Sequence, residues 1–292
     1  MNAPSLSVVI AVQMAQQNLP EIMQRLACER RPDVEFLVCH TDADPDVPRL
    51  LANRENIRVL PGAPGSLIPH LWRDGILVAR GATVAVTTAH CIPDENWLQC
   101  LLHADMSNVV GIGGVLENHP DSTAKDWAIF LQRYLPFAPP QATRTVEEIA
   151  ADNAVYRRAD ILQHRDLLEQ GFWEPSFHAR FRAAGLSLAL EPRLRVIHRN
   201  RYRAWQFFGQ RFAHGREFGL ARAIRLPPSK RVLLIALSPL LPLVFLRKIV
   251  VAAKRHSQYR RQLLRALPWM LFFLLGWGLG EARGYVDSLV GR

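Results

Sequence analysis

Polar side chains that could bind a ligand follow a short apolar segment near residue 88. Residues 82–86 are small or β-branched, and Thr87, Thr88 and His90 come next, before Pro93. Such a run is typical of a buried strand in a parallel sheet, and ligands of open α/β sheets bind at the carboxyl ends of strands. We therefore expect Thr88 and His90 to lie at a ligand site.

The imidazole of His90 offers two kinds of chemistry at such a site. Together with His198, which ends a later predicted strand, it could hold a divalent metal softer than Mg²⁺, such as Mn²⁺, or it could hydrogen-bond to a phosphate. A second interpretation stays open, in which each histidine only hydrogen-bonds to the backbone. Thr88-Ala89-His90 contains no carboxylate, so a hard cation such as Mg²⁺ lacks its preferred ligand there.

Strand and helix patterns alternate through the first two thirds of the chain. Strands are predicted at 6–12, 34–39, 57–60, 82–87, 108–115, 186–190 and 194–197, and helices at 18–30, 66–80, 94–106 and from 174 to about 185. Residues 118–148 contain several prolines and are predicted to form a variable loop region. This order predicts an α/β fold with a mostly parallel sheet flanked by helices.

The composition predicts a body with a basic, apolar tail. Residues 199–292 contain 18 Lys and Arg against 3 Asp and Glu, whereas residues 1–198 contain 18 against 23. We divide the chain into a domain at 1–225 and a C-terminal helical region at 226–292. The apolar segment 6–12 is short and follows no basic residue, which predicts a core strand rather than a signal peptide and a body in the cytosol.

The cysteines give little indication of a metal or disulfide site. Cys28, Cys39, Cys91 and Cys100 have neither CxxC spacing nor the accompanying histidines of a zinc site. We therefore expect free thiols in a reducing compartment.

Two apolar runs in the tail point to a membrane. The run at 232–245, which two prolines interrupt and Arg247-Lys248 separate from 249–253, and the run at 267–280 are both shorter than the roughly 20 residues of a spanning helix. The segment 254–265 between them carries five Lys and Arg, which opposes a hairpin that places this loop outside. We favour helices lying in the cytoplasmic leaflet on anionic lipid, with an apolar hairpin as the alternative. Arginines among aromatic residues also fit nucleic-acid binding, an interpretation that the apolar runs disfavour.

In this order, the segments resemble the family 2 glycosyltransferases of the GT-A fold over most of residues 5–220. In that family, acidic residues after the second strand bind the nucleotide, and a DxD motif after a later strand binds a metal. A carboxylate at the start of a later helix is the catalytic base. The matching positions here are Asp42 and Asp44, Thr88-Ala89-His90, Pro93 with Trp97-Leu98, Asn153 with Arg157-Arg158, Glu174 with Arg180, and His198.

The resemblance implies a donor site with a degenerate DxD motif. The residues that it assigns to the donor are Asp42, Asp44, Thr88, His90, Asn153, Arg157 and Arg180, with His90 and His198 as metal ligands. The leaving diphosphate needs a cation, Mn²⁺ or Mg²⁺, or basic side chains in its place. The residues alone leave other interpretations open, because Asp42 and Asp44 also fit a polar turn and Arg157 fits a solvated surface.

The resemblance also implies that Glu174 is the general base. An inverting transfer needs a carboxylate that takes the proton of the acceptor hydroxyl. Glu174 lies six residues before Arg180, as in the family, but Trp173 replaces the usual acidic neighbour and Pro175 follows directly. The other interpretation is an exposed glutamate in the first helical turn that the helix dipole stabilises.

The implied function is that of a membrane-associated hexosyltransferase. It would move a sugar from a nucleotide-sugar donor, taken as a UDP-sugar, to a lipid-linked or membrane-proximal saccharide acceptor in cell-envelope polysaccharide or glycolipid biosynthesis. Family members often carry a C-terminal apolar pair that ends in Gly-Glu-x-x-Gly-Tyr, as residues 280–285 do. The degenerate DxD motif supports an alternative, a catalytically inactive relative that binds donors or scaffolds other membrane enzymes.

Overall fold

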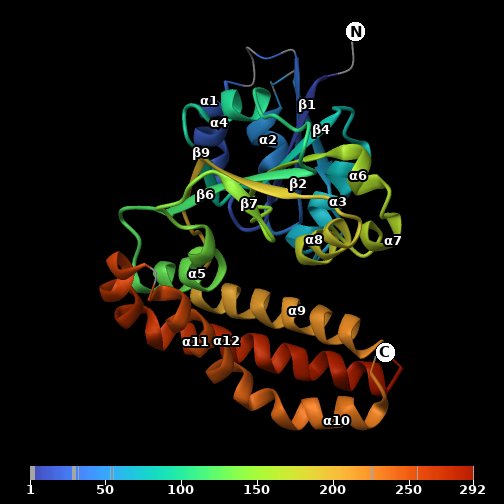
Figure 1. Cartoon of the computed structure of the whole chain (residues 1–292), viewed down its shortest axis with the longest axis vertical. Coiled ribbons are helices and arrows are strands. Elements are labelled where there is room, and N and C mark those ends of the chain that lie inside the picture. Colours follow the sequence, from blue (N-terminus) through green and yellow to red (C-terminus); the bar gives the residue numbers. More distant parts are fainter. Residues whose placement is uncertain are drawn as a thin grey trace. The chain divides into compact units, whose positions relative to one another are not determined.

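One sheet is the framework of the first structural unit, which comprises residues 1–119 and 137–201 of the computed structural model. The structure describes residues 4–27, 31, 33–52, 54, 56–224, 226–254 and 256–291, so Cys28 lies outside it. Within these residues the sheet has nine strands in the order β3-β2-β1-β4-β8-β6-β9-β5, with β7 paired to β9 (Figure 1). The strands are β1 (Leu6–Val12), β2 (Val34–His40), β3 (Ile57–Pro61), β4 (Thr83–Thr88), β5 (Cys91–Pro93), β6 (Gly111–Asn118), β7 (Arg144–Val146), β8 (Asn153–Arg157) and β9 (Leu188–His198).

The first half of the sheet is parallel, as the sequence predicts. β1 pairs in parallel with β2 and β4, and β2 pairs in parallel with β3. Every residue of β1 and β2 is buried, because helices cover both faces of such a sheet. The helices of this half are α1 (Leu19–Leu26), α2 (Val47–Leu51) and α3 (Ile68–Val78).

The second half of the sheet is mixed. β8 runs antiparallel to both β4 and β6, while β9 is parallel to β6. The carboxyl ends of β1, β2, β4, β6 and β9 therefore share one edge with the amino end of β8. The remaining helices of this unit are α4 (Trp97–Leu102), α6 (Arg158–Leu162), α7 (Arg165–Leu168) and α8 (Glu174–Ala183). The predicted α/β class is confirmed.

Two predictions about local structure are wrong. Residues 118–148 contain the helix α5 (Ala124–Tyr134), which Thr123 caps by accepting a hydrogen bond from the Asp126 backbone N–H. The prolines that predict a loop follow this helix. The two short strands expected at 186–190 and 194–197 are one strand, β9, which continues through Pro192. Its pairing with β6 shifts between Gly113 and Val115, so the proline lies at an irregularity where no ladder hydrogen bond is required.

Helices form the second unit, residues 120–136 and 202–292. They are α5, α9 (Ala204–Ala223), α10 (Pro228–Leu237), α11 (Leu241–Ala253) and α12 (Arg260–Leu289). The backbones of α9 and α12 touch, because a Cβ on Gly280 would lie 2.0 Å from the carbonyl oxygen of Phe212. Gly276, Gly280 and Gly284 recur every four residues, the small-residue spacing that lets helices approach closely in membranes. The predicted domain boundary at residue 225 stays a prediction. In the structure, the last boundary along the chain between the two units falls between residues 201 and 202.

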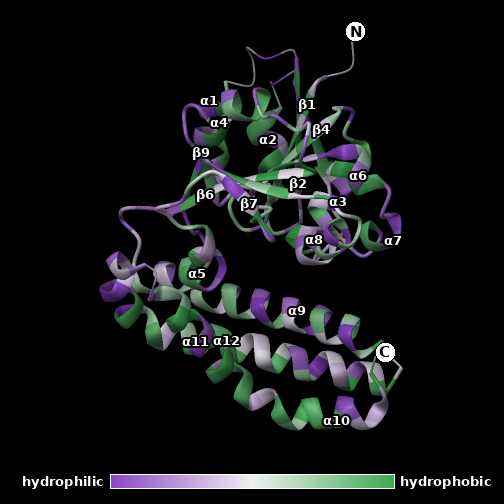
Figure 2. Cartoon of the chain, in the orientation of Figure 1, coloured by the Kyte–Doolittle hydropathy of each residue, from purple (hydrophilic) through white to green (hydrophobic). Residues whose placement is uncertain are grey.

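Two helical segments of the described chain are long and apolar enough to cross a membrane by length and composition. They are Pro228–Ala253 and Ser257–Leu289. In the most apolar 18-residue stretch of each segment, 11% of the first and 44% of the second is buried. The first therefore exposes most of its apolar side chains, and Figure 2 colours long stretches of α10 and α11 as hydrophobic. The two helical segments extend beyond the apolar runs of the sequence, and whether they span a membrane or lie in it stays a prediction.

Glu35 joins four segments at the amino edge of the sheet. Its buried carboxylate accepts hydrogen bonds from Ser7 Oγ (2.8 Å), the Arg80 backbone N–H (2.9 Å), Arg80 Nε (2.8 Å) and Arg58 Nη1 (3.3 Å). Burial raises the pKa of Glu35, but the hydrogen bonds and charge of Arg80 and the Ser7 hydroxyl lower it more. The net pKa is below the ordinary value of 4.5.

Replacing Glu35 with glutamine is expected to lower the free energy of unfolding by about 1.5–3 kcal/mol at neutral pH, because charge-assisted hydrogen bonds are lost. Since the folded state lowers the pKa of Glu35, its contribution is present above the unfolded pKa of 4.5 and is lost as the pH falls. Urea unfolding of the wild type and Glu35→Gln over the acidic range measures this difference. A difference that does not shrink towards low pH would contradict the account.

Candidate functional site at the carboxyl edge of the sheet

Loops from distant parts of the sequence meet at the carboxyl edge. The strand registers pair Ala11 with Thr88, Val12 with His40, and Cys91 with His198. The ends of β1, β2 and β4 are therefore held beside one another by backbone hydrogen bonds, and β5, which follows β4 in the chain, pairs with the end of β9. This is the edge where open α/β sheets bind ligands.

His90 and His198 lie next to each other at this edge, as the sequence predicts. Both side chains are fully buried, and their ring centroids are 6.1 Å apart with planes inclined by 36°. His90 Nε2 is 3.0 Å from the carbonyl oxygen of Gln13, and the His90 carbonyl accepts a hydrogen bond from the Arg199 backbone N–H at 2.7 Å. His90 thus connects the loop after β1, through its imidazole, with the segment after β9, through its backbone carbonyl.

A carboxylate that sequence reasoning missed lies beside Thr88. The Thr88 hydroxyl donates to Asp152 Oδ1 at 3.4 Å, and both side chains are buried. Asp152 reaches this position because β8 is antiparallel to β4, so the residue before β8 lies at the end of β4. Its one sequence signal is that it precedes Asn153. An acidic group is therefore close to Thr88-Ala89-His90, although the motif itself has none.

Asp44 and Asp42 have different environments after β2. The buried Asp44 carboxylate accepts hydrogen bonds from the backbone N–H groups of Met14, Ala15 (2.9 Å) and Gln16 (2.9 Å). It thereby holds the loop after β1, in which Met14 has a φ of 57°. Asp42 is exposed and accepts a long hydrogen bond, 3.4 Å, from the backbone N–H of Gly65. Asp44 therefore fixes the conformation of the loop after β1, whereas the Asp42 side chain is exposed to solvent and to ligands.

Asn153 is bound on three sides by the protein. Its amide nitrogen donates to the carbonyl oxygens of Val115 (2.9 Å) and Leu194 (3.0 Å), and its oxygen accepts from Trp97 Nε1 (2.7 Å). The side chain is fully buried. Two predicted motif positions, Trp97 and Asn153, therefore contact each other, and Asn153 positions β6, β8, β9 and α4. The geometry gives no support to its expected donor contact.

The expected donor ligands Arg157 and Arg180 lie away from this group. Arg157 is at the other end of β8, paired in register with Thr83, and its Nε donates to Asp160 at 2.6 Å. Arg180 is exposed on α8 and donates to Asp166 at 3.0 Å. Their roles in donor binding stay predictions that the positions of the side chains do not support.

Glu174 begins α8 and is half-buried. The segment before it is attached to the start of α3 by the hydrogen bond from the Phe172 backbone N–H to the Pro69 carbonyl (2.8 Å). α3 follows the carboxyl end of β3, so this attachment places Glu174 towards the candidate edge. Burial raises the pKa of Tyr156 far above 10, and the nearby charges of Glu174, Glu148 and Asp152 raise it further.

A buried relay that the sequence did not indicate supports α8. The Tyr156 hydroxyl is 2.9 Å from His178 Nε2, and His178 Nδ1 is 2.8 Å from Glu148 Oε2. Because a carboxylate only accepts, His178 Nδ1 donates to Glu148, and Nε2 is the ring atom that contacts the Tyr156 hydroxyl. Burial raises the pKa of Glu148, but contacts with His178 and Arg182 lower it more, for a net decrease.

The side chains at the edge do not form a complete site for a hard divalent cation. Within the described part of the chain, no group of three or more His, Cys, Asp or Glu side chains is placed to hold a metal ion. His90 and His198 provide two imidazoles, whereas Mg²⁺ requires a nearly octahedral set of oxygen ligands. We therefore derive no chemical step through a metal.

Solved structures share this fold. The chain aligns with a mannosyltransferase of Pyrobaculum calidifontis, solved in complex with GDP-Man and Mn²⁺, at 15% identity and a TM-score of 0.55, over 100% of this chain and 89% of that one. It also aligns with residues 1–349 of TarS from S. aureus at 13% identity and a TM-score of 0.49, over 99% and 92%. No family model matches the sequence, and neither does any curated protein. The first likeness shows that the chain has the predicted GT-A glycosyltransferase fold.

The hydrogen bond between Trp97 and Asn153 is expected to couple their contributions to stability. Asn153→Ala leaves buried partners unsatisfied, which costs about 1–3 kcal/mol for each group. Trp97→Phe removes the shared donor, so a double-mutant cycle should give a coupling of about 0.5–3 kcal/mol. Urea unfolding of the four proteins measures it.

Trp173→Phe is the matched control for this cycle. Trp173 Nε1 donates to the Gln170 carbonyl at 2.9 Å rather than to Asn153. Its effect should add to that of Asn153→Ala. Additive effects in the Trp97 cycle as well would show that Asn153 does not act through this bond.

Proposed function

We propose that this chain is a glycosyltransferase that moves a hexose from a nucleotide-sugar donor to a lipid-linked or membrane-proximal saccharide acceptor. The observation that carries the proposal is the convergence of His90, His198, Thr88 and Asp152 at the carboxyl edge of a sheet with the glycosyltransferase fold. The GDP-Man bound to the mannosyltransferase neighbour supports a nucleotide-sugar donor. We take UDP as the nucleotide, following the family resemblance.

In the proposed mechanism, the loop that Asp44 holds and the exposed Asp42 contact the nucleoside of the donor. The diphosphate lies near His90, His198 and Arg199. A cationic guanidinium and imidazole N–H groups there stabilise the negative charge that develops on the leaving oxygen. Arg199 is already oriented, since its Nη2 lies 3.2 Å from His119 Nε2 and its Nη1 donates to Glu21.

Glu174 is the proposed general base. Its carboxylate takes the proton of the acceptor hydroxyl while that oxygen forms a bond to the anomeric carbon. The bond from the anomeric carbon to the diphosphate oxygen breaks on the opposite face, so the configuration inverts and the nucleoside diphosphate leaves with the bonding electron pair. Glu174 lies in the first turn of α8, at the amino end of that helix.

The helical unit is proposed to keep the enzyme at the cytoplasmic face of the membrane. The exposed apolar side chains of Pro228–Ala253 and the excess of arginine in residues 199–292 support this location. Helices lying in the interface keep all these charges on one side, and an apolar hairpin is the other arrangement.

A catalytically inactive relative is the second candidate. The observation in its favour is that Thr88 and His90 occupy the two positions where the DxD motif of the resembled family has carboxylates, while both His90 and His198 are fully buried. Such a protein would bind a nucleotide sugar or hold partner enzymes at the membrane without transferring sugar.

Glu174→Gln is expected to lower kcat by about 10²–10⁴-fold with donor affinity unchanged, because proton removal is lost while the donor contacts remain. Release of nucleoside diphosphate from a panel of UDP-sugars and GDP-Man, with membrane lipid extract as acceptor, measures turnover. Calorimetric titration measures donor affinity.

Glu169→Gln is the matched control, because Glu169 is an exposed glutamate that precedes α8. It should retain wild-type turnover. Normal turnover by Glu174→Gln would refute the base assignment. A wild-type chain that binds a donor but releases no diphosphate from any would support the inactive relative instead.

A further inference from the structure

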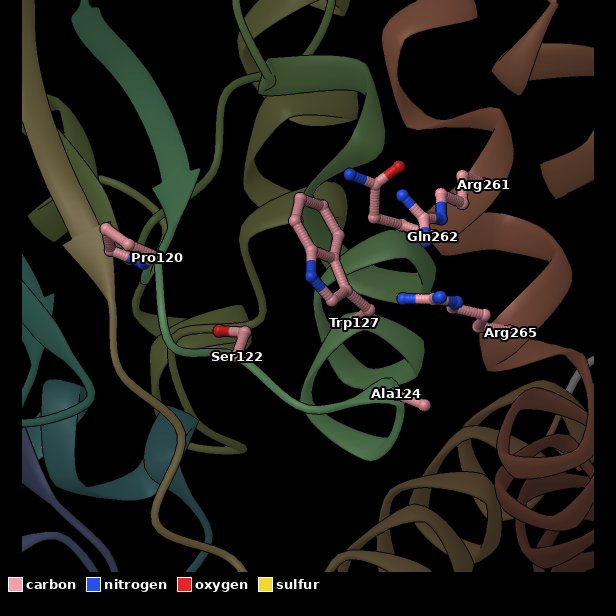
Figure 3. A pocket seen from close by; sticks show the side chains of 7 residues that line it. All are labelled: Pro120, Ser122, Ala124, Trp127, Arg261, Gln262 and Arg265. Atoms are coloured by element: carbon pink, nitrogen blue, oxygen red, sulfur yellow. The ribbon is translucent and has the colours of Figure 1, made fainter.

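A small cavity in the helical unit has the composition of an anion site. It encloses about 260 Å³ between the start of α5 and the first turns of α12. Its wall includes Ser122, Trp127, Arg261, Gln262 and Arg265 (Figure 3). The volume is below the ~300–1,000 Å³ typical of pockets for drug-sized ligands, so a head group rather than a whole cofactor fits.

The cavity has uncompensated positive charge. Arg261 and Arg265 are one helical turn apart, both are exposed, and within the described residues neither has an ion-pair partner. The carboxylate of Asp126, in the first turn of α5, is occupied by Thr123 and by Lys125 at 3.3 Å. Arginine binds phosphate oxygens through paired hydrogen bonds, so two arginines in one cavity wall are suited to an anionic group of this kind.

Gln262 gives the cavity wall a hydrogen-bond acceptor. Its Oε1 atom is buried and has no hydrogen-bond partner in the described structure. Buried acceptors are normally satisfied, so an unpaired one in a cavity wall indicates a donor on a ligand. A hydroxyl group attached near the phosphate would supply it.

Trp127 forms a rigid, apolar wall. Its ring packs against Tyr259, with centroids 5.3 Å apart, and against Phe130 at 5.6 Å. In Figure 3 the side chains of Gln262 and Arg265 extend from α12 towards this ring. An indole beside a guanidinium is typical of the boundary between lipid and water, where the ring contacts carbon and the charge contacts phosphate.

The position of the cavity along α12 relates it to a membrane. Arg265 lies two residues before the apolar run at 267–280, and the whole segment Ser257–Leu289 is long and apolar enough to cross a membrane by length and composition. The cavity is therefore beside the amino-terminal end of the apolar run of α12.

We propose that this cavity binds the head group of an anionic phospholipid, phosphatidylglycerol in particular. Arg261 and Arg265 bind the phosphate oxygens, a glycerol hydroxyl donates to Gln262 Oε1, and Trp127 packs against the glycerol carbons. This site is separate from the carboxyl edge of the sheet and does not depend on Glu174 or on sugar transfer. Occupancy would hold α5 and α12 together at the membrane surface.

The test uses the full chain in a neutral detergent, titrated with short-chain phosphatidylglycerol below its micelle concentration. Calorimetry is expected to show binding that is weaker by about tenfold or more in the double variant Arg261→Gln/Arg265→Gln. Arg247→Gln/Lys248→Gln is the matched control, since it removes two exposed charges from α11, outside the cavity. It should bind within about twofold of the wild type.

Three further probes distinguish the sources of this chemistry. Short-chain phosphatidylcholine should bind weakly, and Gln262→Met should weaken binding of phosphatidylglycerol but not of inorganic phosphate. Equal losses in the two double variants, or none in either, would overturn the proposal. So would inorganic phosphate binding as tightly as the lipid, which would make this a site for free phosphate. Circular dichroism of each variant confirms that the helices are retained.

Discussion

The side-chain amide of Asn153 holds the middle of the sheet together. It bonds to β6 through Val115, to β9 through Leu194, and to α4 through Trp97, all within the buried core. Because an unsatisfied buried amide is costly, these bonds fix where β8 begins. The start of β8 in turn places Asp152 beside Thr88. The arrangement of polar side chains at the carboxyl edge therefore depends on Asn153, which is itself fully buried.

Much of this edge follows from the sequence because strand direction in a parallel sheet is predictable. Continuous apolar runs predict β1, β2 and β4, and their carboxyl ends must coincide. The contact between His90 and His198 follows from the same rule, since β9 also points towards this edge. The resemblance to a glycosyltransferase family over residues 5–220 predicts the fold that the structure shows.

The misplaced residues have physical causes that a sequence does not display. β8 is antiparallel, so Arg157, four residues after Asn153, lies at the opposite end of β4. Asp44 reads as a nucleotide ligand, but its carboxylate is used by the backbone of a loop about thirty residues earlier. Asp152 has no local pattern, because its position depends on a pairing across the sheet. The helix α5 was not predicted, because prolines later in the same segment indicated a loop.

The helical unit uses its few acidic residues internally. Glu281 and Asp287 are buried and pair with arginines of α9, while glycines bring the two backbones into contact. Arg261 and Arg265 form no ion pair within the described residues, so their charges are available to a ligand. A sheet with the glycosyltransferase fold and a basic, apolar helical unit in one chain fit the proposed enzyme with an acceptor at a membrane.

The central claim is that a nucleotide sugar binds at the carboxyl edge of the sheet. Hydrogen exchange of the full chain, with and without UDP-sugars or GDP-Man, tests it most directly. The account predicts slower exchange in the backbone amides of residues 13–16, 62–65, 88–90 and 198–201, with little change at the amino edge around Glu35. Exchange that is unchanged at these loops in the presence of a bound donor, or slowed only elsewhere, would contradict it.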